Sequence, residues 1–376
     1  MKIGVISTMS GFVWGGSEEL WAAMVREALG QGHQAAVSVY RFRAVAQQMK
    51  ELERRGARVL TRPMPRDEGL KAKVNRLWNP PFRDLEAFGP EVLCITQGGT
   101  FDAVQEFWSY LRFMIERYSI PYIVISQFND DRFLLDEGTR RVASEFFGRA
   151  RKILFVSAHN RLTAERQLAR SLPGAEVVRN PYNLEDTSPV PWPCAERTWI
   201  ACVARLDVWA KGQDLLFEAF SSEDWVKRDW RLRLYGEGGD LRYLKALADH
   251  FRISGYVDFK GQAADIRDVW AENHLLVLPS RAEGTPLVLV EGMLCGRPAV
   301  VTDVGDNALW IEDGRTGFIA ASPTARSIGA ALERAWKTRG EWKRMGKNAH
   351  AVAQERIDPE SGRTLLRLVV AAGSRP

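Results

Sequence analysis

Short apolar, β-branched runs alternate with longer amphipathic stretches along most of the chain. This pattern is typical of βα units whose strands form parallel sheets, so the sequence predicts an α/β fold. In the first half the predicted strands are Lys2–Ser7, Ala35–Tyr40, Val92–Thr96, Tyr122–Ser126, Lys152–Ser157 and Ala175–Arg179. In the second half they are Trp199–Ala204, Arg231–Tyr235, Val257–Lys260, Leu275–Pro279 and Pro298–Thr302. Each half is therefore expected to form a doubly wound sheet.

A polar segment, Asn180–Pro193, separates the two sets of strands. It carries four prolines and has no helical periodicity, as is common in linkers between domains. The predicted domains are residues 1–184 and 185–355. Two such domains are expected to face each other across a cleft.

The composition agrees with two globular domains and excludes several other classes. The 376 residues are 45% hydrophobic and 26% charged, unlike a disordered or collagenous chain. No segment has the length of a membrane span, and the start of the chain lacks the features of a signal peptide, so we expect any membrane contact to be peripheral. Four cysteines without Cys-x-x-Cys spacing predict reduced thiols in a cytoplasmic protein, and the sequence predicts no metal site.

The positive charge is concentrated in one segment, Arg41–Arg76. It holds eleven Lys or Arg and four Asp or Glu, a net +7 against +5 for the whole chain. Two interpretations stay open: a solvated helical face, or a basic patch that contacts anionic lipid headgroups. Nucleic acid is a weaker candidate because no nucleic-acid-binding motif surrounds the segment.

The most informative stretch is His274–Leu294, which reads as a buried strand, a short loop and an apolar helix. Thr285 is the predicted N-cap of this helix and Pro286 its first residue. Glu291 is a carboxylate within the apolar helix, where an ion needs a partner or a ligand.

The loop before this helix has a second carboxylate, Glu283, at the carboxyl end of the strand. Open α/β sheets bind their ligands at that edge. The backbone amides of Gly284, Thr285 and Leu287 at the helix N-terminus offer hydrogen-bond donors to an anion. The sequence therefore predicts a ligand site here.

With seven residues between them in EGTPLVLVE, Glu283 and Glu291 resemble the Glu-x7-Glu signature of retaining glycosyltransferases of family 4. Three further stretches agree in order. GVIST…GGSEELW resembles the first strand and glycine loop of that family, VARLDVWAKGQDLL its diphosphate-binding segment, and RLYGEGGD with VDFKGQ its glycine-bearing strand ends. The resemblance is close over residues 199–320 and looser over 1–40.

This resemblance implies a GT-B fold, in which two Rossmann-like domains carry the acceptor on the N-terminal side and the donor on the C-terminal side. The implied reaction moves a sugar from a nucleoside-diphosphate sugar to a glycan, lipid-linked or small-molecule acceptor with retention of configuration. No cofactor and no metal are implied, and the chain has no Asp-x-Asp triplet. The last helix, about residues 356–376, is expected to pack back on the N-terminal domain.

The resemblance also assigns roles to individual residues. Glu283, Arg205 and Lys211 are the candidate catalytic residues, with the two cations on the diphosphate and Glu283 on the donor sugar. Glu291 is expected to accept hydrogen bonds from ribose hydroxyls. The candidate donor-binding residues are Gly15, Gly16, Gly284, Thr285, Pro286, Leu287, Glu291, Gly236 and Gln127.

Two departures from the family pattern concern the site. Gln127 stands where the family often has a histidine that contacts the donor sugar, so donor choice is expected to differ, although a turn or capping role is equally consistent. In the stretch VGDNALWIEDG, Asp306 and Leu309 stand where the family usually has a glycine and a glutamate.

Other functions with this architecture stay open. One is a nucleotide-sugar epimerase, although such an enzyme usually has catalytic acids and a histidine suited to elimination rather than the Glu-x7-Glu pattern. A non-catalytic scaffold that binds a sugar nucleotide or a glycan would keep the fold without turnover. A dinucleotide-dependent oxidoreductase is disfavoured because no Gly-x-Gly-x-x-Gly follows the first strand.

Overall fold

The computed structural model describes residues 1–64 and 81–374, which form two compact units. The N-terminal unit comprises Met1–Pro181 with Asp358–Pro376, and the C-terminal unit comprises Tyr182–Ile357. These limits lie within a few residues of the domain boundaries that the sequence predicts, 184/185 and 355/356.

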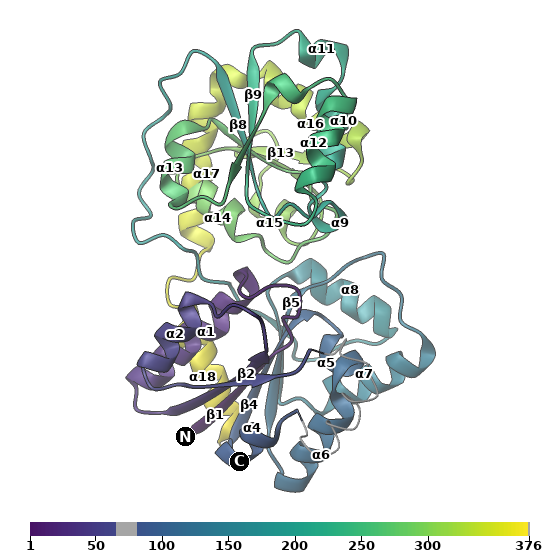
Figure 1. Cartoon of the computed structure of the whole chain (residues 1–376), viewed down its shortest axis with the longest axis vertical. Coiled ribbons are helices and arrows are strands. Elements are labelled where there is room, and N and C mark those ends of the chain that lie inside the picture. Colours follow the sequence, from purple (N-terminus) through teal and green to yellow (C-terminus); the bar gives the residue numbers. More distant parts are fainter. Residues whose placement is uncertain (65–80, 375–376) are drawn as a thin grey trace. The chain divides into compact units, whose positions relative to one another are not determined.

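The N-terminal unit has a seven-stranded parallel sheet in the order β3-β2-β1-β4-β5-β6-β7 (Figure 1). Its strands are β1 (Lys2–Ser7), β2 (Gln34–Tyr40), β3 (Arg58–Arg62), β4 (Val92–Gly99), β5 (Tyr122–Phe128), β6 (Lys152–Phe155) and β7 (Glu176–Val177). Its helices are α1 (Gly16–Gly30), α2 (Gln47–Arg54), α4 (Arg83–Phe88), α5 (Asp102–Glu106), α6 (Trp108–Tyr118), α7 (Glu137–Arg149), α8 (Ala158–Leu168) and α18 (Ser361–Gly373). The first strand lies inside the sheet, as in the Rossmann order.

Helix α18 brings the end of the chain back to the N-terminal unit. Its apolar residues Leu365 and Val369 share one buried core with Leu20 and Trp21 of α1. Gly362 permits close contact, because a Cβ there would lie 2.7 Å from the backbone carbon of Ala23. A second core covers the other face of the sheet with residues of α5, α6 and α7.

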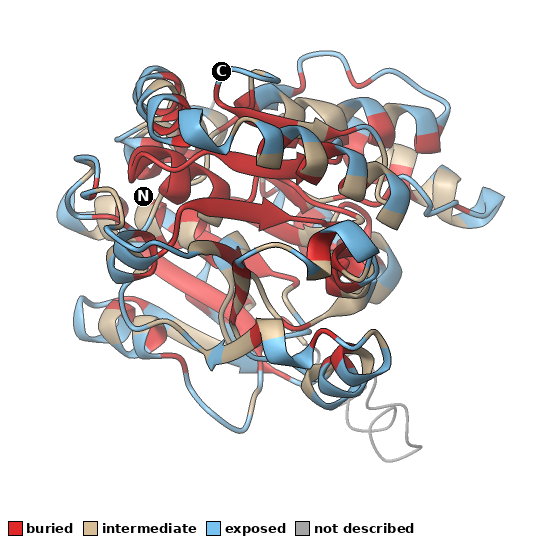
Figure 2. Ribbon diagram, turned by 90° about the horizontal axis from the view of Figure 1, so that it is seen from above, coloured by how far each residue is buried: buried red, intermediate tan, exposed pale blue. Residues whose placement is uncertain are grey.

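The C-terminal unit has a six-stranded parallel sheet in the order β10-β9-β8-β11-β12-β13. Its strands are β8 (Thr198–Val203), β9 (Trp230–Tyr235), β10 (Val257–Gly261), β11 (Leu275–Leu278), β12 (Ala299–Thr302) and β13 (Gly317–Ala320). Its helices are α9 (Val208–Lys211), α10 (Gln213–Phe220), α11 (Glu223–Val226), α12 (Leu241–His250), α13 (Ile266–Glu272), α14 (Leu287–Leu294), α15 (Asn307–Trp310), α16 (Ala325–Lys337) and α17 (Trp342–Arg356). Buried residues concentrate on the strands and on the helix faces turned toward them (Figure 2).

All eleven predicted strands are present, but the sequence analysis missed β3 and β13. Both lie at sheet edges, where a strand needs only one partner and carries a weak apolar pattern. The strand β3 reads RVLTR and was interpreted as part of the basic segment. That segment therefore contains an edge strand, and its residues 65–76 lie outside the described part of the chain.

The proline-bearing linker packs against the C-terminal unit through a buried arginine. Arg297 Nη1 donates to the carbonyl of Val190 at 3.2 Å, and Nη2 donates to that of Pro191 at 2.6 Å. The backbone amide of Val190 donates in turn to the carbonyl of Cys295. Among the helices of the described residues, none is long and apolar enough to cross a membrane.

Candidate functional site

The C-terminal sheet changes its winding direction between β8 and β11, which are neighbours in the sheet although β9 and β10 lie between them in the sequence. Ligands of open α/β sheets bind beyond the carboxyl ends of the strands at such a point. Arg205 follows β8, and Glu283 follows β11. The predicted catalytic residues of this unit therefore come from the two strands that form the switch point.

Lys211 and Glu283 form a largely buried ion pair at this place. Lys211 Nζ lies 2.6 Å from Glu283 Oε1, and the two side chains are only 16% and 7% exposed. The hydroxyl of Ser280 donates to the same carboxylate oxygen at 2.7 Å. The pair holds the Lys211 ammonium, a group with three hydrogen-bond donors, at the strand ends.

Arg205 supplies a second cation to the same strand ends. Its Nη1 lies 3.6 Å from Asp207 Oδ2. Burial lowers the pKa of the Arg205 guanidinium, an effect that the charges of Asp207 and Glu283 oppose, and the group remains charged at neutral pH. The buried Gln213 donates to the Arg205 carbonyl at 2.6 Å and so holds its backbone.

Gly236 lets β9 end directly against the segment that carries Arg205. Its φ is +130°, and a Cβ there would lie 2.1 Å from the carbonyl oxygen of Ala204. Only glycine fits this backbone conformation and this spacing. The sequence analysis placed Gly236 in the donor site, and the structure gives it a role in shaping the loop beside Arg205.

Helix α14 begins one residue later than predicted. Pro286 occupies the N-cap position, Leu287 is the first helical residue, and no side chain caps the helix. The prediction that Thr285 is the N-cap is therefore wrong, because the backbone of Pro286 is extended (φ −69°, ψ 122°). Gly284 and Thr285 still lie in the loop that joins β11 to this helix.

Glu291 is buried in α14, with 5% of its surface exposed. Its Oε1 accepts a hydrogen bond from the backbone N–H of Asn183 at 3.0 Å. The carboxylate predicted to need a partner thus has one in the linker backbone.

Two of the residues that depart from the family pattern, Asp306 and Leu309, lie in the C-terminal unit. The backbone amide of Asp306 donates to the carbonyl of Gly284 at 2.9 Å, which ties the two loops together. Leu309 is 46% exposed. The loop therefore supports the helix N-terminus through its backbone.

The predicted glycine loop of the N-terminal unit differs from expectation. The stretch GGSEELW predicts Ser17 as the cap of the helix that follows. That prediction is wrong, because helix α1 begins at Gly16, with Gly15 as its N-cap and no side-chain cap. The φ of Gly15 is −153°, which is ordinary extended backbone. Gly15, Gly16 and Gln127 belong to the N-terminal unit, whereas the other nine candidate residues belong to the C-terminal unit.

The sequence analysis missed a buried acid below this loop, Glu18. Its exposed fraction is 3%, and its Oε2 accepts a hydrogen bond from the Ser7 hydroxyl at 2.8 Å. Burial raises the pKa of Glu18 to about 7, so its charge changes near neutral pH. The sequence signal that could have identified Glu18 as a buried acid is its place among the apolar positions of the helix that begins in GGSEELW.

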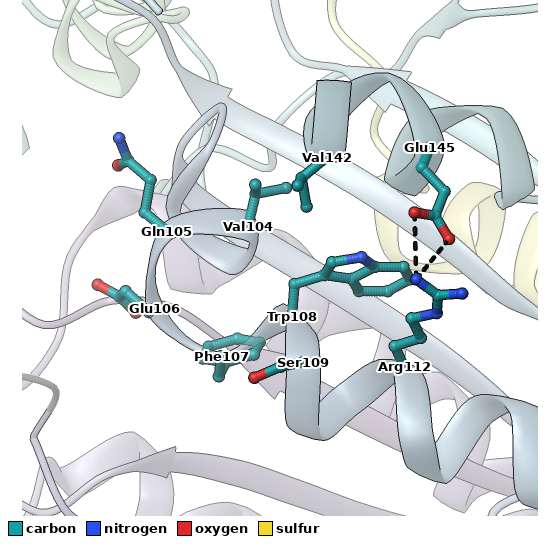
Figure 3. A pocket seen from close by; sticks show the side chains of 9 residues that line it. All are labelled: Val104, Gln105, Glu106, Phe107, Trp108, Ser109, Arg112, Val142 and Glu145. Carbon is teal, nitrogen blue, oxygen red and sulfur yellow. Dashed lines mark hydrogen bonds and ion pairs between the residues drawn. The ribbon is translucent and has the colours of Figure 1, made fainter. Parts of the chain in front are cut away.

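A pocket of about 400 Å³ opens on the N-terminal unit between α5, α6 and α7 (Figure 3). Its wall includes Trp108. Beside that ring, Arg112 of α6 pairs with Glu145 of α7, with Arg112 Nη1 3.2 Å from Glu145 Oε1. None of the predicted site residues lines it. A smaller pocket, of about 50 Å³, includes Glu18 together with Phe12 and Met49.

Several solved structures match nearly the whole chain. HepE of Anabaena, solved in complex with UDP-glucose, superimposes with a TM-score of 0.77 at 19% identity and covers 99% of this chain and 100% of its own. A glycosyltransferase of Rickettsia africae gives a TM-score of 0.76 at 12% identity, covering 100% of this chain and 99% of its own. At these identities the likeness shows the fold alone, and the protein has the GT-B fold.

The family model for "Glycosyl transferases group 1" matches residues 197–338, within the C-terminal unit. Among curated relatives, an exopolysaccharide phosphotransferase of Streptomyces coelicolor is 30% identical over 123 residues, which are 32% of this chain and 13% of that protein. A D-inositol 3-phosphate glycosyltransferase of Gordonia bronchialis is 32% identical over 111 residues, 29% of this chain and 24% of that protein. The aligned part thus spans about a quarter or less of these relatives.

Proposed function

We propose that the protein is a glycosyltransferase that moves a sugar from a nucleoside-diphosphate sugar to a hydroxyl of an acceptor, with retention of configuration. The observation that carries this proposal is the arrangement of Arg205, Lys211 and Glu283 at the switch point of the C-terminal sheet. The family model covers this arrangement, and HepE was solved with UDP-glucose. The acceptor class extends to glycans, lipid-linked sugars and small molecules.

In the proposed reaction the bond between the anomeric carbon and the diphosphate breaks, and the acceptor oxygen bonds to that carbon from the same face. The acceptor proton passes to the departing diphosphate. Arg205 and Lys211 stabilise the charge that develops on the diphosphate, as fixed cations do most effectively in a site that excludes water. Glu283 orients the sugar through its hydroxyls, and no metal takes part. Unchanged turnover in a chelator and an unchanged anomeric configuration in the product, measured by NMR, are the expected results.

Replacing Glu291 by alanine is expected to weaken nucleotide binding about 10- to 100-fold, because hydrogen bonds to a charged group are worth about 1.5–3 kcal/mol. Calorimetric titration with UDP, GDP and ADP measures the effect. A thermal-shift series with the corresponding glucose nucleotides identifies the preferred base, since a ligand stabilises the folded state by mass action.

Glu291→Gln is the matched control. Its side-chain oxygen can still accept from the Asn183 amide, so the folded state keeps this contact, whereas the negative charge is lost. We expect Glu291→Gln to melt close to the wild type and to bind nucleotide with intermediate affinity. Unchanged nucleotide affinity in both variants, with a lower melting temperature for Glu291→Ala, would show a purely structural role.

We further propose that the described part of the basic segment gives the protein a peripheral contact with anionic membranes. Arg41 and Arg43 are exposed beside Val45, which is 59% exposed. Arg62 is excluded from this surface because it is buried, with its guanidinium 3.9 Å from the centre of the Tyr40 ring. Each surface cation near an anionic membrane adds about 1 kcal/mol of attraction.

Cosedimentation with vesicles containing phosphatidylserine is expected to decrease with added salt and to fall about tenfold in Arg41→Ala/Arg43→Ala. Lys343→Ala/Lys347→Ala removes two exposed cations of α17 and is the matched control. Equal binding by both double variants would leave the segment as an ordinary solvated surface.

The second candidate function is a non-catalytic scaffold that binds a sugar nucleotide. The exposed Leu309, in place of the family's usual glutamate, favours it. Binding of a nucleotide sugar without transfer or donor hydrolysis in any acceptor series would support this alternative over the enzyme. Interconversion of the sugar without transfer would instead indicate an epimerase.

A further inference from the structure

Lys211 and Glu283 lie on two separate segments of the C-terminal unit. Lys211 is the last residue of the four-residue helix α9, and Glu283 lies in the loop after β11. Their side chains meet at 2.6 Å although they are 72 positions apart in the chain. A helix of one turn leaves most of its backbone groups without partners inside the helix. Contacts from outside α9 must therefore hold it at this distance from the loop.

Arg281 joins the two segments through its backbone and its side chain. It stands two residues before Glu283, and its backbone amide donates to the Ala210 carbonyl at 2.8 Å. Its Nη1 donates to the Val208 carbonyl at 2.5 Å. Two carbonyls of α9 thus accept hydrogen bonds from one residue of the loop that carries Glu283.

Asp214, in the first turn of α10, adds a bidentate ion pair with Arg281. Its Oδ1 lies 2.7 Å from Arg281 Nη1, and its Oδ2 lies 2.7 Å from Nη2. Each side chain is only 20% exposed. A fork of two parallel hydrogen bonds fixes the direction of the contact as well as its length. The pair therefore holds the start of α10, and with it the turn after Lys211, against the loop after β11.

Gly212, which joins α9 to α10, shows how closely the two segments approach. Its φ is +64°, and a Cβ there would lie 2.2 Å from the Pro279 carbonyl oxygen, directly after β11. Only glycine fits this conformation and this spacing. The turn after Lys211 thus packs on the backbone after β11, and Arg281 acts where the two segments already touch.

The guanidinium of Arg281 is committed to contacts within the protein. Nη1 serves both the Val208 carbonyl and Asp214 Oδ1, and Nη2 serves Asp214 Oδ2. The charge of Asp214 also compensates that of the guanidinium. Arg281 therefore supports the segment that carries Lys211, whereas Lys211 itself reaches Glu283.

We propose that Arg281 and Asp214 are positioning residues that set the place of Lys211 beside Glu283 for the transfer reaction. The inference rests on the proposed function, in which Lys211 stabilises the charge on the departing diphosphate. A displacement of about 1 Å in a catalytic group can lower a rate about 100-fold. Weakening the pair therefore lowers kcat, while nucleotide affinity changes little because Glu291 keeps its place in α14.

Arg281→Lys is the first test of the pair. A lysine keeps the positive charge but lacks the planar fork that matches a carboxylate, so the contact with Asp214 loses its direction. With UDP-, GDP- or ADP-glucose as donor, we expect kcat to fall about 10- to 100-fold and the donor KM to stay near that of the wild type. Asp214→Asn keeps one accepting oxygen and is expected to show a smaller loss of kcat in the same direction.

Arg228→Lys is the matched control, because Arg228 makes a bidentate ion pair of the same kind elsewhere in the unit. Its Nη1 and Nη2 lie 2.6 Å and 2.9 Å from the two carboxylate oxygens of Glu333, and its side chain is 19% exposed. Both lysine variants are expected to lower the melting temperature by a few degrees. Only Arg281→Lys is expected to lower kcat. An equal loss of kcat in both variants would show a general effect of stability and overturn the inference.

A double-mutant cycle with Lys211 separates positioning from a merely structural role. If Arg281 acts through Lys211, Arg281→Lys lowers kcat much less in the Lys211→Ala background than in the wild type. Full additivity of the two losses would overturn the inference and leave the proposed function intact, as would a wild-type kcat in Arg281→Lys. Absence of wild-type turnover with every donor would contradict the proposed function and the inference with it.

Discussion

Replacing Lys211 by alanine is expected to lower kcat by about 10²- to 10³-fold, the cost of removing one preorganised donor from a developing anion. The effect on nucleotide affinity should be much smaller, because the diphosphate carries its greatest additional charge as the sugar leaves. Steady-state transfer assays and calorimetric titration with the nucleoside diphosphate separate the two quantities. A loss in affinity equal to the loss in kcat/KM would show that Lys211 contributes only to binding.

The ion pair requires a control, because Lys211→Ala removes the ammonium that pairs with the Glu283 carboxylate. The Glu283 side chain is only 7% exposed. Burying an unpaired charge destabilises a protein whatever its function. In the double variant Lys211→Met/Glu283→Gln no unpaired charge remains, so the melting temperature should recover while turnover stays low. Lys227→Ala, which removes a 70% exposed lysine of the same unit, should leave both unchanged. Recovery of turnover in the double variant would contradict the proposed role.

The donor residues could be predicted from the sequence because each is close in sequence to a recognisable strand end. Glu283 comes shortly after a fully apolar run, and Lys211 is followed directly by Gly212. Their meeting at 2.6 Å depends on β8 and β11 being neighbours, which the order of the chain does not state. The alternation of strands and helices predicted the fold class, whereas the edge strands β3 and β13 were missed.

The acids of the N-terminal unit could not be predicted in the same way. Glu18 and Asp102 owe their raised pKa values to burial, and burial is a property of the packed unit. Gln127 was recognised only through a family position. Its unpaired amide and its place beside Gly98 emerge from the register of β4 and β5. The sequence identifies residue types at strand ends, and packing decides which of them lack partners.

Replacing Gly236 by alanine is expected to impair both stability and turnover. The φ of +130° alone costs a residue with a side chain roughly 1–3 kcal/mol, and the Cβ would lie 2.1 Å from the Ala204 carbonyl oxygen. The backbone before Arg205 must therefore move. A displacement of about 1 Å in a catalytic group can lower the rate about 100-fold. Thermal denaturation and kcat measurements follow the two effects separately.

Gly239→Ala provides the matched control three residues further along the same loop. A Cβ at Gly239 would meet no atom within 4 Å, and its φ is not positive, so stability and turnover should stay near those of the wild type. If Gly239→Ala damages turnover as strongly as Gly236→Ala, the whole loop tolerates no side chain and the close approach to Ala204 is not the cause. Loss confined to Gly236→Ala, with turnover that stays low at a temperature where the fold persists, would locate the defect in the placement of Arg205.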